Sequence, residues 1–262
     1  MSILDRFSLK NRIALVTAGS GPLFGSSITE ALAEAGATVI TASRSLERNQ
    51  EFAAQLQEMD HDVHAMQVDI TDIDSIGRLQ QGVISQFGRL DVLVNSALTR
   101  SGHTGLLEDL TTENISDVAS GDFVGLFEIT RKFLRGMVEQ GSGSIINIAS
   151  IYGVVGNDPS LYVDTDMKPA PTYTFVKAGM INFSRTLACH YGKHGIRVNC
   201  ISPGGYLDNQ PENFLKRYIQ RVPVGRMLEN DDLKGAVVFL ASDASTYITG
   251  ENLMVDGGWT CL

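Results

Sequence analysis

The stretch that decides the fold is "RIALVTAGSGPLFGSSITEALAEAG", residues 12–36. It starts with an apolar, β-branched run, continues through a glycine-rich turn and ends in a helical pattern closed by Gly36. Glycines permit tight turns and let a backbone approach a phosphate closely, and the start of a helix favours an anion. Strand, turn and helix in this order predict a phosphate-binding turn. A plain strand-to-helix turn, which also favours glycine, is the alternative.

The rest of the chain repeats this alternation. Apolar runs recur at 37–43, 62–69, 90–97, 144–150, 196–202 and 252–256, with helical patterns between them, one of which ends at Gly88. Short apolar strands that alternate with helices predict a parallel sheet covered on both faces. Since no repeat or linker divides the sequence, we predict one doubly wound α/β domain of the Rossmann type over residues 1–262, with seven parallel strands. Such a domain binds ligands beyond the carboxyl ends of its strands.

Composition narrows the class of protein. The chain has 30 acidic and 21 basic residues, a net charge of −9 and no basic run, so nucleic-acid binding is not expected. The start, "MSILDRFSLK", does not match a signal peptide, and every apolar run is far shorter than a membrane span, so we expect a cytoplasmic protein. Three cysteines without C-x-x-C spacing predict buried, unreactive thiols. His190 and His194 lack a third ligand at suitable spacing, and we predict no metal site.

A second motif carries the candidate chemistry. In "PTYTFVKAG", residues 171–179, Tyr173 and Lys177 are four residues apart and share one face of a predicted helix. A free tyrosine has a pKa near 10, and a neighbouring cation favours the phenolate and brings this pKa toward neutrality. The pair therefore predicts an acid–base group. The alternative is a tyrosine packed on the helix with a solvated lysine one turn later.

Eight segments together resemble one family. In order they are the glycine turn, "VDITD" (68–72), "LDVLVNSA" (90–97), "GLFEITR" (125–131), "SIINIAS" (144–150), Tyr173-x-x-x-Lys177, "HGIRVNCISPGG" (194–205) and "YITGENLMVDGG" (247–258). Over nearly its whole length the chain resembles the short-chain dehydrogenases/reductases. The resemblance implies NAD(P)(H)-dependent transfer of a hydride between nicotinamide and a carbonyl or secondary alcohol.

The resemblance also implies residue roles. Tyr173 would be the acid in reduction and the base in oxidation, Lys177 would lower its pKa and bind the nicotinamide ribose, and Ser150 would hold the substrate oxygen. Asp122 stands where the family has an asparagine that helps to place a water beside the lysine, and it would bring a negative charge into the catalytic group. The implied cofactor-binding residues are Gly19, Ser20, Gly21, Leu23, Phe24, Gly25, Ser43, Arg44, Asp69, Ile70, Asn95, Ser96, Ala97, Tyr173, Lys177, Pro203, Gly204 and Tyr206.

The end of the second strand indicates the cofactor. An acidic residue there would bind the 2′-hydroxyl of the adenosine ribose and repel a 2′-phosphate. This chain has Ser43 at that position and Arg44 next to it, and an arginine binds phosphate through a bidentate fork. We therefore expect NADP(H) rather than NAD(H). A solvated loop arginine is the alternative.

Two further departures from the family concern backbone segments. In the glycine turn, Ala18 follows Thr17, one residue is inserted and Leu23 replaces a glycine. The segment between Ser150 and Tyr173 is about ten residues longer than usual, which predicts an enlarged substrate loop at about 151–172. With residues 204–214 it resembles members from bacterial surface-sugar and flagellin-glycan pathways. Its acidic side chains would disfavour a diphosphate, so we expect a sugar or polyol without a nucleotide.

Two other functions stay open at this point. Sugar-nucleotide epimerases and dehydratases also carry Tyr-x-x-x-Lys, although they generally add a C-terminal substrate domain that we do not expect here. A non-catalytic nucleotide-binding protein on the same fold is the second alternative. The family resemblance further implies that helices near 122–140 and 172–192 pack against symmetry mates, which predicts a homodimer or homotetramer.

Overall fold

A seven-stranded parallel sheet with strand order β3-β2-β1-β4-β5-β6-β7 forms the centre of the computed structural model, which describes residues 2–99 and 101–261. The strands are β1 (Ile13–Thr17), β2 (Thr38–Ser43), β3 (Val63–Gln67), β4 (Val92–Asn95), β5 (Gly143–Ile148), β6 (Ile196–Pro203) and β7 (Asn252–Val255). Each overlaps one of the seven apolar runs, so the predicted sheet is confirmed.

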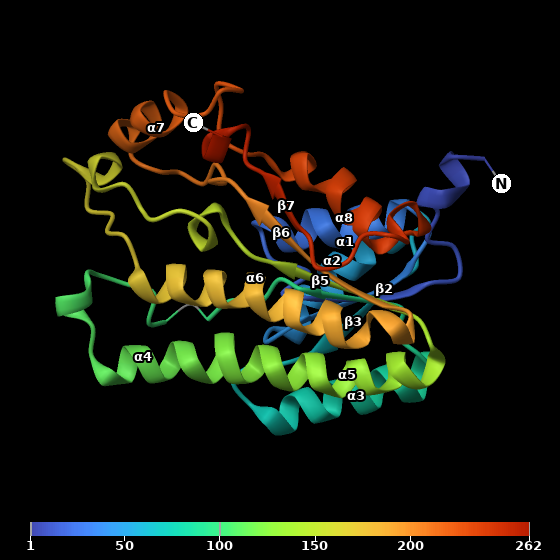
Figure 1. The fold of residues 1–262 in the computed structure, drawn as a ribbon. Coiled ribbons are helices and arrows are strands. Elements are labelled where there is room, and N and C mark those ends of the chain that lie inside the picture. Colours follow the sequence, from blue (N-terminus) through green and yellow to red (C-terminus); the bar gives the residue numbers. More distant parts are fainter. Residues whose placement is uncertain (1, 100, 262) are drawn as a thin grey trace.

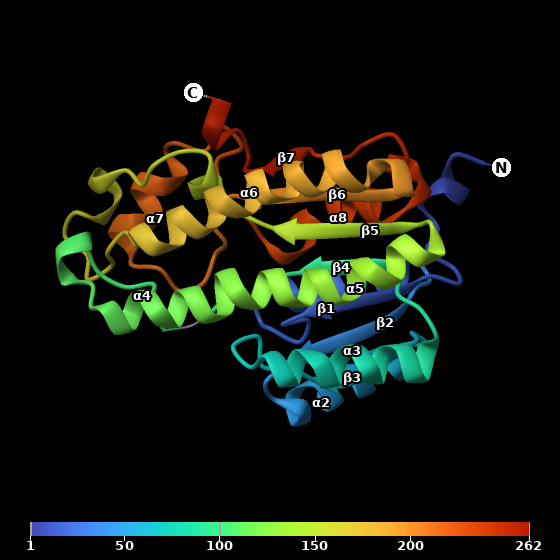
Figure 2. The same ribbon diagram turned by 60° about the horizontal axis from the view of Figure 1, so that its bottom comes forward.

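Helices cover both faces of the sheet (Figure 1, Figure 2). One face packs against α1 (Phe24–Glu34), α2 (Leu46–Gln57) and α8 (Lys234–Ala241), and the other against α3 (Ile73–Phe87), α5 (Leu126–Gln140) and α6 (Pro171–Tyr191). Two shorter helices, α4 (Thr112–Val118) and α7 (Glu212–Ile219), lie beyond the sheet. None of the helices in residues 2–99 and 101–261 is long and apolar enough to cross a membrane.

The apolar runs are explained by burial on both faces. In β1, Ala14 and Val16 belong to the core beneath α1 and α8, whereas Leu15 belongs to the core beneath α3 and α5, and all three are fully buried. Successive side chains of a strand point to opposite faces, so a strand covered on both sides needs apolar residues at every position. The sheet is therefore rigid where its carboxyl ends present polar residues.

The chain reverses direction across the sheet between β1 and β4. From β1 it proceeds outward through β2 and β3, and it then returns to place β4 on the other side of β1. The glycine turn after β1 and the loop after β4 consequently border one crevice. Figure 2 shows the enlarged loop and α7 at this same carboxyl end of the sheet, opposite the N-terminus.

A π-helical segment, Ala119–Gly125, joins α4 to α5, and the three form one long rod (Figure 2). A Cβ on Gly125 would collide with the Ile70 carbonyl, and one on Gly121 would lie 2.7 Å from the Thr99 methyl. These glycines let the segment pass directly against the loops that follow β3 and β4. The wider turn places Asp122 inside the protein, with only 5% of its surface exposed.

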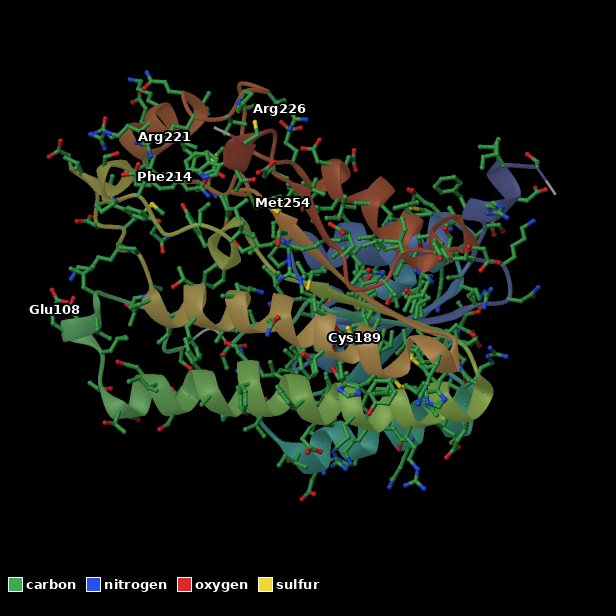
Figure 3. The ribbon with its side chains drawn as sticks, viewed as in Figure 1. Glu108, Cys189, Phe214, Arg221, Arg226 and Met254 are labelled. Carbon is green, nitrogen blue, oxygen red and sulfur yellow. The ribbon has the colours of Figure 1, made fainter. Side chains whose placement is uncertain are left out.

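The enlarged loop packs against α7. Leu161 of the loop and Phe214 and Tyr218 of α7 share an apolar cluster, in which the Tyr218 ring stacks on Trp259 at 4.3 Å between centroids. Figure 3 shows Phe214 and Arg221 at this end of the molecule, whereas Cys189 lies farther along α6. The enlarged loop is therefore held against α7 by apolar contacts.

Ion pairs also join the loop to α7 and the turn after it. Asp158 pairs with Arg221, and Asp164 lies 3.7 Å from Arg217. These two carboxylates therefore have cationic partners, whereas Asp166 of the same loop is exposed. That the loop acids disfavour a diphosphate stays a prediction.

Candidate active site

Tyr173 and Lys177 lie on the first turns of α6, which begins with Pro171 at a position where a missing N–H costs nothing. The Lys177 Nζ is 5.5 Å from the centre of the Tyr173 ring and donates a 2.6 Å hydrogen bond to the Ile148 carbonyl at the end of β5. Only 5% of Lys177 is exposed. Burial lowers the pKa of Lys177 to about 8, although the negative charge of Asp122 acts in the opposite direction.

Ser150 follows β5 and is buried beside Tyr173. Its Oγ accepts a 3.2 Å hydrogen bond from the Tyr152 N–H, which begins a short 3₁₀ turn. Burial raises the pKa of Tyr173, hydrogen bonding with Ser150 opposes this shift, and the charge of Asp122 adds to it. The structure therefore brings Ser150, Tyr173 and Lys177 together, in the arrangement that the sequence predicted.

The pKa of Tyr173 differs from the sequence expectation. We expected Lys177 to lower it, whereas the pKa is raised. The physical reason is that tyrosine and lysine are both withdrawn from water, so burial disfavours phenolate and ammonium alike.

Asp122 contacts a residue that sequence reasoning missed. Its Oδ1 accepts a 2.8 Å hydrogen bond from the Thr99 N–H, and its Oδ2 accepts one from the Thr99 hydroxyl. The same Oδ2 lies 2.7 Å from Nε2 of His103, whose ring meets that of Tyr173 edge to face at 5.6 Å. No sequence motif includes His103, and only the fold brings it to Asp122 and α6.

A cavity of about 250 Å³ lies at the crevice between β1 and β4. The predicted residues that line it are Ser20, Gly21, Ser43, Arg44, Asp69, Ile70 and Ala97, and those not predicted are Ala18, Ala42, Ser45, Arg48, Val68, Thr71, Leu98 and Thr99. Arg48 is the most informative addition, since it places a second guanidinium in the cavity. Arg48 lies on the first turn of α2, which begins at Leu46, two residues after Arg44.

The glycine turn fits a phosphate in spite of its altered sequence. A Cβ on Gly25 would collide with the Ala18 carbonyl, and Ala18 itself has a left-handed backbone with φ of 54°. Leu23 has φ of −84°, so its position does not require glycine, and its side chain does not cap α1. The first N–H groups of α1 therefore lack a side-chain acceptor and suit a pyrophosphate.

The buried side chain of Asn49 accepts hydrogen bonds from two serine hydroxyls near the cavity. Its Oδ1 accepts hydrogen bonds from Ser20 at 2.5 Å and from Ser43 at 2.7 Å, and its Nδ2 donates to the Met66 carbonyl. A serine has one hydroxyl proton, so Ser43 has none left to donate to a 2′-phosphate in this arrangement. Arg44 and Arg48 supply the guanidinium groups among the residues that line the cavity.

Other predicted cofactor residues take different places. Asn95 does not line the cavity, because its Nδ2 donates to Asn147 at 2.8 Å and to Thr130 and thus joins β4 to β5 and α5. Ser96 is also absent from the lining, and its N–H donates to the Thr17 hydroxyl. Their places in a groove for the cofactor stay predictions, and the contacts of both residues in this structure are with neighbouring strands and helices. Gly19 packs against Thr29 and Thr41 beneath the turn.

The segment after β6 approaches the glycine turn from the other side. Pro203 ends β6, and Gly204 donates a hydrogen bond to the Val255 carbonyl. The Tyr206 ring meets the ring of Phe24, the first residue of α1, edge to face at 5.4 Å. The contact of Tyr206 with Phe24 brings this segment beside the start of α1, and a role for it at the nicotinamide stays a prediction.

Comparisons with known proteins agree with this geometry. Residues 24–260 match the family described as enoyl-(acyl carrier protein) reductase. The chain is 31% identical to a 3-oxoacyl-[acyl-carrier-protein] reductase of Thermotoga maritima (95% of this chain, 98% of that protein) and 33% identical to an NADP-dependent mannitol dehydrogenase of Alternaria alternata (97% and 94%). A gluconate 5-dehydrogenase of Burkholderia cenocepacia, solved with NADP and tartrate, superimposes with a TM-score of 0.89 at 26% identity over the full length of both chains. The chain belongs to the short-chain dehydrogenase/reductase family of NAD(P)(H)-dependent oxidoreductases.

Proposed function

We propose that this oxidoreductase transfers a hydride between NADP(H) and a secondary alcohol or ketone of a small polyol or sugar. The observation that carries the proposal is the position of Ser150, Tyr173 and Lys177 at the carboxyl end of the sheet that also bears the cavity with Arg44 and Arg48. The residues of this cavity would hold the adenosine part of the nucleotide, and Tyr173 and Lys177 of α6 would lie at its nicotinamide end.

The three catalytic side chains have distinct roles. A bound nicotinamide would supply or accept the hydride, and its oxidised form would add positive charge near Tyr173. Tyr173 Oη gives its proton to the substrate oxygen in reduction and takes one from the alcohol in oxidation. Ser150 Oγ donates a hydrogen bond to the same substrate oxygen as negative charge develops there. Lys177, held by the Ile148 carbonyl, supports the phenolate and binds the ribose of the nicotinamide.

Preference for NADP(H) is supported by charge at the far end of the crevice. Arg44 and Arg48 both line the cavity, and no acidic residue follows β2 at the position of Ser43. A dianionic 2′-phosphate gains charge-assisted hydrogen bonds from guanidinium groups, whereas a ribose hydroxyl gains much less. Asp69 lines the same cavity, and its Oδ1 accepts hydrogen bonds from the Thr71 N–H and hydroxyl.

The choice of a polyol or sugar rests on relatives. Mannitol dehydrogenase, gluconate 5-dehydrogenase and D-arabinitol 2-dehydrogenase from Candida tropicalis are named for polyhydroxylated substrates. The resemblance to surface-sugar and flagellin-glycan members favours the same chemical class. The reductases of 3-oxoacyl thioesters among the relatives make a 3-oxoacyl thioester the second candidate substrate.

One two-stage experiment tests the function. In the first stage, we expect NADPH to raise the melting temperature of the protein more than NADH does. In the second stage, we expect turnover of NADP⁺ with mannitol, arabinitol or gluconate, or of NADPH with the matching ketoses. Turnover only with a 3-oxoacyl thioester would select the second candidate. Stabilisation by NADPH without turnover of either substrate class would instead indicate a non-catalytic protein, and conversion of a sugar nucleotide without net change in NADPH would indicate an epimerase.

Assembly and location complete the proposal. An apolar groove of about 670 Å³ runs between the π-helical segment, α5 and α6, and the exposed rings of Phe123, Phe127 and Phe175 lie along it. Contiguous apolar surface of this kind is typical of protein interfaces, so we propose a homodimer or homotetramer that uses these helices. A cytoplasmic location stays a prediction from composition.

A further inference from the structure

The unexplained feature of the site is the group of polar side chains around Asp122. His103 has hydrogen-bond partners on both ring nitrogens: Nε2 lies 2.7 Å from Asp122 Oδ2 and Nδ1 lies 3.1 Å from the Thr172 Oγ1. Thr172 lies directly before Tyr173, and only 9% of the His103 side chain is exposed. An aspartate and a histidine are thus buried together against the catalytic tyrosine.

The hydrogen bonds fix how many protons this group holds. The Thr172 hydroxyl donates to the Gly102 carbonyl at 3.1 Å, and a carbonyl can only accept. Because the only hydroxyl proton of Thr172 is used in that bond, Thr172 Oγ1 must accept the hydrogen bond from His103. The Nδ1 atom of His103 therefore carries a hydrogen. One more proton lies between Nε2 and Asp122, whose carboxylate already accepts from the Thr99 N–H and hydroxyl. These two donors favour the carboxylate form, which leaves the proton on Nε2.

We propose that His103 is a positioning residue of this site, which binds Asp122 as an imidazolium and cancels the charge that the carboxylate would present to Tyr173 and Lys177. The pair is then neutral as a unit. It also links Thr99 and His103 to the π-helical segment and to the first turn of α6, because Asp122 accepts from Thr99 and His103, and His103 contacts Thr172. The inference rests on the proposed function only for the roles of Tyr173 and Lys177.

Few other charges act on this group within the described residues. Tyr173 and Lys177 face it from α6, and Cys200 of β6 lies on the far side of Lys177. The carboxylate of Asp122 by itself raises the pKa of both Tyr173 and Lys177. Asp109 and Lys168 pair with each other at the exposed edge of the neighbouring loops. Among the residues that the structure describes, the ring of His103 is the cationic partner in contact with Asp122.

The first test is a titration that needs neither cofactor nor substrate. The signals of isotope-labelled lysine, assigned with Lys177→Met, are followed by NMR through the pH range around 8, where Lys177 titrates. In His103→Gln the carboxylate loses its counter-charge, and we expect the Lys177 midpoint to rise by about one pH unit. In the double variant His103→Gln/Asp122→Asn the charge is absent, and we expect the midpoint to return to or below the wild-type value.

A merely structural role for His103 gives a different result. If His103 only holds the loop in place, its loss would change the Lys177 midpoint in both variants. The midpoint of the double variant would then not return to the wild-type value. A wild-type midpoint in His103→Gln, or an equal rise in the double variant, would overturn the proposal. Turnover of the polyol panel is a separate measurement, so failure of the proposed function leaves this result interpretable.

A second measurement uses unaltered His103 and does not depend on the stability of those variants. The other four histidines, none of which is buried, are replaced by glutamine: His61, His64, His190 and His194. The ¹⁵N shifts of the remaining imidazole should show two protonated nitrogens at pH 7. One unprotonated ring nitrogen at that pH would contradict the ion pair.

Discussion

Lys177 Nζ lies over the ring of Tyr173, 5.5 Å from its centre, and is anchored by a 2.6 Å hydrogen bond to the Ile148 carbonyl. Both partners of the ammonium are uncharged, and 95% of the lysine surface is withdrawn from water. The ammonium form of Lys177 is therefore disfavoured in the folded protein. Burial lowers the pKa of Lys177 to about 8. Stability is given up here for function.

Lys177→Met should stabilise the cofactor-free protein at neutral pH. Between the folded pKa of about 8 and the unfolded pKa of 10.5, the unfolded chain binds more protons, so wild-type stability rises with pH across this interval. Below pH 8 the lowered pKa of Lys177 reduces the free energy of unfolding by about 3 kcal/mol, since one pKa unit corresponds to about 1.4 kcal/mol. The advantage of the variant in urea unfolding should thus shrink by up to about 3 kcal/mol from pH 7 to 10.5. An advantage that grows with pH would show the sign to be wrong.

Tyr173→Phe should abolish the proton transfer and little else. We expect kcat to fall by about 10²–10⁴, because the phenol is the acid–base group, while NADPH still raises the melting temperature nearly as in wild type. Tyr162→Phe, in the enlarged loop, is the matched control for loss of a tyrosine hydroxyl. Turnover within a few-fold of wild type in Tyr173→Phe would remove this residue from the mechanism.

The sequence predicted features that depend on local pattern. The seven strands and the Tyr173–Lys177 pair followed from periodicity and spacing, since burial on both faces demands apolar runs and a helix repeats every 3.6 residues. The roles of His103 and Asn49 could not be predicted. His103 is 19 residues from Asp122 and Asn49 is 29 residues from Ser20, and these pairs meet only in the folded protein. The contact between Asn95 and Asn147 could not be predicted for the same reason, since Asn147 comes from the neighbouring strand.

Arg44→Ala should weaken NADPH binding by about 1.5–3 kcal/mol, the range for a hydrogen bond to a charged group, and leave NADH binding nearly unchanged. Arg48→Ala should act in the same direction, since both guanidinium groups line the cavity. Arg135→Ala, an exposed arginine on α5 outside the cavity, is the control for lost positive charge. Equal losses for NADPH and NADH, measured by calorimetry, would show that neither arginine binds the 2′-phosphate.

Phe175→Asp should convert the assembled protein to monomers. The Phe175 side chain lies on the groove between α5 and α6 with 79% of its surface exposed, and a buried charge on both copies would oppose the contact. Loss of a central aromatic contact typically costs at least 2 kcal/mol, which corresponds to a rise in the dimer Kd of about 30-fold. Met59→Asp, an equally charged change at an exposed apolar residue after α2, should leave the mass from light scattering unaltered. A wild-type monomer at micromolar concentration would contradict the proposed assembly, and an unchanged mass in Phe175→Asp would move the interface to another face.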